Sequence, residues 1–552
     1  MFGWAGKILR VNLGKERIFE EELKPEANLD VLGGRGLAVK LFTTEVKPEV
    51  DPLSSENKII LMTGPLTGTG VNSASLCAIV TKSALTQTLV GAEVKLYFGA
   101  ELKAAGYDGI IIEGKAKEPV ILEIQDERVN ILPADYLVGQ DTKTTITLFK
   151  NTFNDPWVAR EVRVLCIGPA GEKQLPVAAL VADGLLVSES VGIGAVFGSK
   201  NLKAIAVRGT KDVLVNNGQR LIGAISTAVK ECINNKALNT FSLFGSYHTY
   251  EEFLNKGILP SFYFTRPYVL SVPLSQIQTT WKRKRACFSC PVACLKADQN
   301  GTFFPELEAF IALGPLCGID ELSLICKAYQ ACLNNGLDPV ETGTFIASLM
   351  KISEKKLLEE KELPIKVQFG DKEAYRNLIS LLNQPEGLFS LAKDTASLWE
   401  KVGETEEFVG IKRRSISLDI SHSSFLALYA VTSNWPTLHP HVYGFINIHK
   451  EDIPKKVKTV QDISAVLECL GVCPYLYIGL PLKAFLPMVA AVTGLEWKEE
   501  NLLKVGSHII SLEYGFNQKA GIGLEANRLP KKHQAIGFEN MLKSYYQLRG
   551  WQ

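Results

Sequence analysis

Three cysteines in the middle of the chain, Cys287, Cys290 and Cys294, have the spacing C-x2-C-x3-C. A cysteine that only fills a core behaves as a small apolar residue and has no reason to recur at this spacing. Three thiolates in one tight loop suit a metal centre, whose fourth ligand must come from elsewhere. Cys473, in a distant Glu-Cys-Leu-Gly-Val-Cys segment, is the candidate. Four thiolates are a ligand set for a [4Fe–4S] cluster.

A structural zinc site is the alternative interpretation of these cysteines. Zinc sites usually carry two C-x2-C pairs or a mixture of cysteine and histidine. The sequence has no second such pair, and neither His248 nor His439 has a matching spacing. The pattern therefore favours an iron–sulfur cluster over zinc.

The composition is that of a large globular protein. Its 552 residues predict about two to four domains. Sixty basic and 59 acidic residues nearly cancel, so nucleic acid is not an expected partner. Eleven cysteines without a disulfide-like framework predict a reducing compartment. No apolar signal core and no run of membrane-span length is present, so we expect a cytoplasmic, soluble protein.

Residues 1–210 predict strands joined by tight turns, and helices dominate from about residue 211. Residues 8–13 and 17–19 read as a hairpin, and 109–113 followed by 120–124 and 129–132 reads as another. Several glycine-rich loops lie between these strands, where they either turn the chain or let its backbone approach a ligand. After residue 211, Leu221, Ile222, Ile225, Val229 and Ile233 follow helical spacing.

Two segments share the design of a helix end, a glycine turn and a presented side chain. In the first, a helix capped by Asp320 ends at Gly336, and Asp338 opens a capping box for the next helix. In the second, a helix ends at Gly471 and Cys473 follows. This repetition predicts a pseudo-symmetric pair of loops around one central ligand.

Four consecutive basic residues, 282–285, directly precede the first cysteine ligand. They could attract an acidic electron carrier, or they could form a solvated turn that offsets the charge of an anionic cluster. The second interpretation is the favoured one.

The chain resembles the tungsten-containing aldehyde:ferredoxin oxidoreductase family along essentially its whole length. The resemblance is carried by the cysteine loop and by an ordered series of motifs: Gly33-Gly34-Arg35-Gly36-Leu37, Asp51-Pro52-Leu53, Gly64-Pro65-Leu66-Thr67-Gly68-Thr69, Ala105-Gly106-Tyr107-Asp108-Gly109, Gly168-Pro169-Ala170-Gly171-Glu172, Gly194-Ala195-Val196, Pro305-Glu306-Leu307-Glu308, Leu313-Gly314-Pro315-Leu316 and Phe516-Asn517.

This resemblance implies an α+β fold with three domains. A β-rich base (1–210) would support two pterins that carry tungsten, and two helical domains (211–417 and 418–552) would close over it. The family's cluster ligands correspond to Cys287, Cys290, Cys294 and Cys473. A glutamate, Glu306 or Glu308, and His439 would act near the metal, while Asp338 and Glu468 would contact the pterins. The family oxidises aldehydes to carboxylates and passes the electrons to ferredoxin.

The half of the site that would hold tungstopterin departs from the family pattern. The first glycine loop opens with Leu333, which accepts no hydrogen bond through its side chain, whereas the second keeps a carboxylate at Glu468. Arginines expected at 71–82, 189–196 and 433–439 are missing, and glycines expected at 92–96 are replaced by bulky or charged residues. Arginine forks and open glycine backbone are what hold anionic cofactors. The sequence therefore predicts that Leu333 and residues 92–96 fill the volume of the pterins.

The cluster cysteines are intact while the tungstopterin half of the site is altered, and this contrast leads to three candidate functions. The favoured one is a [4Fe–4S]-carrying subunit that lacks tungstopterin and transfers electrons or acts as a scaffold within an oligomeric complex. Its partners would be a paralogous catalytic subunit and a ferredoxin or ferredoxin-like subunit. The second is an active tungstopterin enzyme that oxidises aldehydes. The presence of Glu306, Glu308 and His439 supports this alternative. The third is a protein whose cluster only stabilises the fold.

Overall fold

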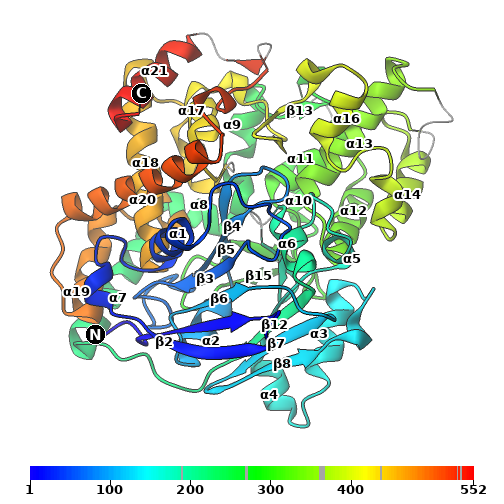
Figure 1. The fold of residues 1–552 in the computed structure, drawn as a ribbon. Coiled ribbons are helices and arrows are strands. Elements are labelled where there is room, and N and C mark those ends of the chain that lie inside the picture. The colour runs from blue at the N-terminus through cyan, green and yellow to red at the C-terminus, as the bar shows by residue number, and fades with distance from the viewer. Residues whose placement is uncertain are drawn as a thin grey trace.

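A β-rich base carries a larger helical part in the computed structural model of the protein (Figure 1). The structure describes residues 1–187, 191–267, 272–359, 367–435, 438–530, 533–534 and 537–551. Parts of two segments named above, residues 189–190 and 436–437, lie outside this range.

Two six-stranded sheets form the base. The first sheet has the order β2-β1-β6-β3-β4-β5. Its strands are β1 (Lys7–Asn12), β2 (Arg17–Glu22), β3 (Ile59–Thr63), β4 (Cys77–Lys82), β5 (Leu89–Val94) and β6 (Gly109–Glu113). The second sheet has the order β11-β10-β9-β12-β7-β8. Its strands are β7 (Val120–Gln125), β8 (Arg128–Pro133), β9 (Arg163–Cys166), β10 (Val181–Ala182), β11 (Leu185–Leu186) and β12 (Leu202–Arg208).

Of the three strand pairings predicted for the hairpins, two are right and one is wrong. β1 pairs with β2, and β7 pairs with β8, each antiparallel. However, β6 does not join β7. It lies in the first sheet, parallel to β1 and antiparallel to β3. A run of short strands does not show from its sequence alone which neighbours pair, because pairing depends on contacts between distant segments.

Successive side chains along the strands of the first sheet point to opposite faces and belong to two different apolar cores. Leu9, Leu61 and Ile79 point toward the second sheet, where Leu122 and Ile205 join the same cluster. Their neighbours Ile8, Ile60 and Val80 point the other way, into a core shared with helices. The first sheet is thus sandwiched between the second sheet and a helical layer, which explains why β3, β4 and β5 are buried on both faces.

The helices are mostly in the second half of the chain. Those of the base are α1 (Gly34–Glu45), α2 (Phe98–Ala104), α3 (Thr142–Lys150), α4 (Pro156–Glu161), α5 (Pro169–Glu172) and α6 (Ile193–Ser199). Those that follow are α7 (Gly218–Asn234), α8 (Lys236–Phe244), α9 (Tyr250–Asn255), α10 (Leu274–Gln278), α11 (Leu307–Leu313), α12 (Leu322–Asn335), α13 (Pro339–Glu354), α14 (Lys372–Leu381), α15 (Pro385–Leu388), α16 (Thr395–Lys401), α17 (Ser424–Thr432), α18 (Ile453–Leu470), α19 (Leu486–Thr493), α20 (Glu499–Lys519) and α21 (Phe538–Arg549).

Small two-stranded sheets punctuate the helical part. They pair β13 (Pro260–Ser261) with β14 (Arg266–Pro267), β15 (Arg283–Arg285) with β16 (Leu295–Ala297), and β17 (Gly410–Ile411) with β18 (Arg414–Ser415). The largest apolar cluster includes residues of α11, α12 and α13 together with residues of α17, α18 and α21. The segments on either side of the predicted boundary at residue 417 therefore share one core.

The predicted α7 exists, but it buries a different face. Leu221, Ala228 and Cys232 are buried, whereas Ile222 and Ile233 are 70% and 60% exposed. Two apolar stripes compete on this helix, and only packing against α19 decides between them. Among the described residues no single helix qualifies by length and apolar content as a membrane span, although the sharply bent pair Leu307–Cys317 and Leu322–Asn335 passes the same test jointly.

The two predicted glycine turns are confirmed, and each presses against a glycine loop of the base. Gly336 ends α12 and Gly471 ends α18, both in the left-handed conformation (φ 64° and 82°). A Cβ on Gly64 would lie 2.1 Å from the carbonyl carbon of Leu470, and one on Gly168 would lie 2.4 Å from that of Asn335. The residue before the first turn of the helix that ends at Gly336 is Glu321, not the predicted Asp320, and its side chain does not cap the helix.

We expect the Gly471→Ala substitution to destabilise the protein by more than the strain of placing alanine in a left-handed backbone conformation. An added Cβ would lie 2.0 Å from Oγ1 of Thr67, in addition to the left-handed backbone. Gly139→Ala is the matched control, because its φ is also positive (74°) but nothing lies within 4 Å of the added atom. Denaturation should give a loss of about 1 kcal/mol for the control and about 3 kcal/mol or more for Gly471→Ala. Equal losses would contradict the close contact.

Candidate metal centre

The three clustered cysteines occupy the loop of a β-hairpin. β15 and β16 pair antiparallel, and residues 286–294 connect them. Ser289 and Ala293 adopt positive φ (52° and 51°), which folds this loop tightly. Cys473 reaches the loop from the end of α18. Ser73 of the base joins the two, since its N–H donates to the carbonyl of Ser289 (3.0 Å) and its carbonyl accepts from the N–H of Cys473 (3.1 Å).

The four predicted ligand cysteines interact electrostatically. Burial, with the charge of neighbouring thiols, raises the pKa of Cys287 to about 11 and that of Cys294 well above its ordinary value. The pKa of Cys473 is also raised by burial, and Cys287 and Cys290 contribute. All four are free thiols. Four thiolates so close together would need a positively charged centre to be stable, and a bound metal centre would supply that charge.

The single-ion alternative finds no support in the geometry. Within the described part of the chain, no group of three or more histidine, cysteine, aspartate or glutamate side chains is arranged to hold one metal ion.

Lys95 lies beside the cysteines and was missed as a site residue. Its side chain is buried, its Nζ donates to the hydroxyl of Tyr475 (3.0 Å) and lies 4.7 Å from the centre of that ring. Its charge counteracts the rise in the pKa of Cys287 and Cys473. The sequence signal was a lysine directly after the buried strand β5, within the segment 92–96 already noted as charged.

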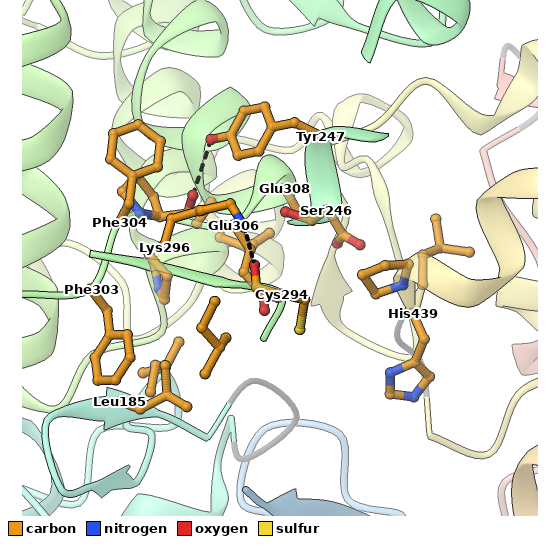
Figure 2. Close-up of a pocket in the computed structure, with 18 of the residues that line it drawn as sticks. Leu185, Ser246, Tyr247, Cys294, Lys296, Phe303, Phe304, Glu306, Glu308 and His439 are labelled. Carbon is orange, nitrogen blue, oxygen red and sulfur yellow. Dashed lines mark hydrogen bonds between the residues drawn. The ribbon is translucent and has the colours of Figure 1, made fainter. Parts of the chain in front are cut away.

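A small cavity adjoins Cys294 and gathers most of the other predicted residues. It has a volume of about 80 Å³, which is room for about three water molecules. Figure 2 shows Cys294, Lys296, Glu306, Glu308 and His439 around it. Asp338, Arg414, Tyr443 and Tyr475 also belong to the polar part of the lining. Glu468, the remaining predicted residue, does not line this cavity.

Glu306 and Glu308 stand at the start of α11. Glu306 is the residue before the first turn, in an extended conformation, and its side chain does not cap the helix. Glu308 is half-buried and accepts a hydrogen bond from the hydroxyl of Tyr443 (2.9 Å). Burial raises the pKa of Glu308 to about 7, although Arg414 and Tyr443 oppose the shift. Glu308 is therefore poised to gain or lose a proton near neutral pH.

His439 is a buried residue of the cavity wall. Its ring packs against His441 and Tyr475, with centroid distances of 5.5 and 6.0 Å. Burial lowers the pKa of His439 to about 3, and the charges of Lys95 and two arginines add to the effect. The imidazole is neutral at any physiological pH.

Asp338 has the structural role that the sequence predicted. Its carboxylate accepts from the N–H groups of Val340 (2.9 Å) and Glu341 (3.0 Å) at the start of α13. The reciprocal half of the predicted capping box is wrong. The carboxylate of Glu341 instead binds the N–H (2.7 Å) and hydroxyl (2.8 Å) of Ser415.

Glu468 belongs to a separate buried ionic cluster. The guanidinium of Arg35 donates to Glu468 (2.6 Å) and, through two nitrogens, to both oxygens of Glu513 (2.8 Å each). The ring of Trp435 covers Arg35 at 3.9 Å. The same ring lies against strand β5, since a Cβ on Gly91 would be 1.9 Å from it. The indole thus fills the space over the backbone of this strand.

Leu333 is buried, as its apolar character predicts, near the end of α12. Its side chain belongs to the large helical core, and its carbonyl accepts a hydrogen bond from Thr142 of α3 (2.8 Å). Its exposed fraction is 3%.

Comparison with known proteins extends over the whole chain. Residues 8–209 match the N-terminal domain of aldehyde ferredoxin oxidoreductase, and residues 224–552 match its domains 2 and 3. Tungsten-containing aldehyde ferredoxin oxidoreductases from Pyrococcus furiosus and Thermococcus kodakarensis are each 32% identical to the chain, over 100% of it and 97% of their own length.

Two further proteins resemble the chain. The WOR-like subunit of an aliphatic sulfonate oxidoreductase from Pyrococcus furiosus is 30% identical over 73% of this chain and 68% of its own length. The active site complex BamBC of benzoyl coenzyme A reductase, solved with 1,5-dienoyl-CoA, has the same fold, with a TM-score of 0.87, 22% identity, and coverage of 100% of this chain and 95% of that one. The chain belongs to the aldehyde ferredoxin oxidoreductase family.

Proposed function

We propose that this chain is a [4Fe–4S]-carrying subunit of an oxidoreductase complex of the aldehyde ferredoxin oxidoreductase type. It lacks tungstopterin, and it transfers electrons or acts as a scaffold beside a catalytic paralogue and a ferredoxin-like protein. Eleven free cysteines fit a cytoplasmic location.

The residues present fit the iron–sulfur cluster. Cys287, Cys290, Cys294 and Cys473 would bind it, and such a cluster supplies one-electron transfer. The protein's own contribution is to fix the two loops through Ser73 and to supply the positive charge of Lys95 nearby. Hydrogen bonds and charges of this kind set a cluster's reduction potential.

The residues present do not fit two pterins with a metal. The observation that carries this conclusion is the cavity of about 80 Å³ beside Glu306 and His439, because sites for ligands of drug size have about 300–1,000 Å³. Trp435, at the place where the family pattern has an arginine, covers the backbone of Gly91. Lys95 replaces a glycine of that pattern and lies on Tyr475. Each change removes either room or charge compensation for an anionic cofactor.

Two relatives support a multi-subunit arrangement. One is named as a subunit, and the other was solved as part of the complex BamBC. A chain that keeps an electron-transfer centre without a substrate site has a use only within such an assembly. The identity of the partner subunits is part of the proposal.

A second function retains support from one feature. Glu306, Glu308, Asp338 and His439 still line a single cavity beside Cys294. In an active tungstopterin enzyme that oxidises aldehydes, Glu308, with its pKa of about 7, would exchange a proton with the substrate. The metal content separates the two functions.

Elemental analysis of the anaerobically purified protein is expected to give about four iron atoms per chain and little tungsten or molybdenum. A tungsten-containing relative produced in the same medium controls for metal supply. Cys473→Ser should lower the iron content and the visible absorbance of the cluster, whereas Cys326→Ser, on α12, should leave both unchanged. One tungsten per chain would overturn the proposal in favour of the active enzyme.

Glu308→Gln should stabilise the protein increasingly as the pH rises. The folded state holds the proton of Glu308 more tightly than the unfolded chain, because burial raises its pKa from 4.5 to about 7. The destabilisation by the charged carboxylate is therefore absent below about pH 4.5 and complete above about pH 7. The difference in unfolding free energy between variant and wild type should grow toward about 3 kcal/mol over this range.

Glu500→Gln, on the exposed first turn of α20, is the matched control for this pH series. Denaturation of both variants and of the wild type from pH 5 to pH 8 gives the comparison. A Glu308→Gln curve that runs parallel to the wild type would show that the carboxyl is not desolvated in the folded protein.

A further inference from the structure

The cysteine loop is carried on a strand whose side chains are all basic. β15 consists of Arg283, Lys284 and Arg285, and Lys282 precedes it. The strand ends two residues before Cys287. Any partner that binds this strand is thereby brought to the edge of the cluster loop, whose tip, Ser289, is itself exposed.

No carboxylate of the described residues neutralises these four positive charges. All four side chains are exposed, and within the described residues none is paired with a carboxylate. The Nζ of Lys284 donates to the hydroxyl of Ser242 on α8 (3.2 Å), and the guanidinium of Arg285 lies 5.9 Å from the ring of Phe303. The chain as a whole, these four residues included, is balanced, with 60 basic and 59 acidic residues. The excess of positive charge at residues 282–285 is therefore local.

The pairing of β15 with β16 brings two positive charges face to face, which costs stability. Lys284 lies directly opposite Lys296, and like charges at facing positions of antiparallel strands are destabilising. A solvated turn would not need this arrangement. Basic residues on an edge strand also prevent unwanted pairing with other strands, but a single lysine is enough for that purpose.

An exposed apolar residue lies next to the basic strand. Leu243 of α8 is 54% exposed and follows Ser242, which binds Lys284 through its hydroxyl and Lys296 through its carbonyl (2.9 Å). A basic surface around a small apolar contact is suited to brief, charge-steered binding of a protein, because charge speeds the encounter and the apolar contact excludes water.

We propose that Lys282, Arg283, Lys284 and Arg285, together with Leu243, form the docking face for a small acidic electron-carrier protein. The inference rests on the proposed function, since it assumes that the adjoining loop holds a cluster. The face is small, as expected for short-lived electron-transfer complexes. A nucleic acid could also contact four basic residues, but nothing in the near-zero net charge favours it and the apolar contact does not serve it.

The test uses the complete, cluster-loaded chain and a purified acidic [2Fe–2S] ferredoxin as the probe. In the double variant Lys282→Glu/Arg283→Glu, both altered side chains are exposed in the wild type. Calorimetry at low salt should show affinity reduced about tenfold or more. The wild-type affinity should fall with added salt, and that dependence should become much weaker in the variant. Electron exchange between the two clusters should slow in parallel.

Lys498→Glu/Lys504→Glu is the control, because it makes the same charge change at positions near the start of α20, away from the cysteine loop. It should change the affinity by about twofold at most, since distant surface charges are screened. Equal losses in both variants, or wild-type binding by Lys282→Glu/Arg283→Glu, would overturn the docking face. So would a variant that loses binding to a single-stranded oligonucleotide but keeps binding to ferredoxin. A purified chain without iron would instead contradict the proposed function.

Discussion

The close contact between Gly64 of the base and Gly471 at the end of α18 determines where the fourth cysteine lies. Neither residue has room for a side chain, so the helix end and the loop meet backbone to backbone. The N–H of Leu66 donates to the carbonyl of Leu470 (3.1 Å), and that of Leu76 donates to the carbonyl of Gly471 (3.1 Å). Cys473 follows two residues later. A cluster that needs four thiolates at fixed separations can therefore draw one from a distant helix, because the helix end is fixed on a rigid sheet.

Buried charge shapes the rest of the site. Arg35 satisfies two carboxylates, Glu468 and Glu513, and is itself covered by Trp435. Desolvated ions are stable only when their partners are close and well oriented. A pterin that entered here would have to displace the indole and compete for the carboxylate of Glu468. Arg35 belongs to the family pattern, whereas Trp435, which covers it, and Lys95, which lies on Tyr475, depart from that pattern.

Local chemistry allowed the helix ends and the cysteine loop to be predicted, and distant contacts decided what could not be. Glycine at a helix end and aspartate before Pro339 act within a few residues, so Gly336, Gly471 and Asp338 could be read directly. The placement of β6 in the first sheet depends on β1 and β3. The face that α7 buries depends on α19. The roles of Lys95 and Trp435 depend on Tyr475 and Gly91, which are far from them in sequence, so spacing could not reveal them.

The hairpin of β15 and β16 links recognition to the cluster. Its loop carries three of the four thiols, and its outer strand carries the unneutralised charge. Lys296 also connects the loop to α8, because its ammonium donates to the carbonyl of Cys294 (2.9 Å) and to that of Ser242 in α8 (2.9 Å). The same short segment therefore carries three of the proposed metal ligands, contacts α8 and faces solvent. In the proposed function this hairpin is the part of the chain that serves electron transfer, because it joins three of the proposed cluster ligands to an exposed basic strand.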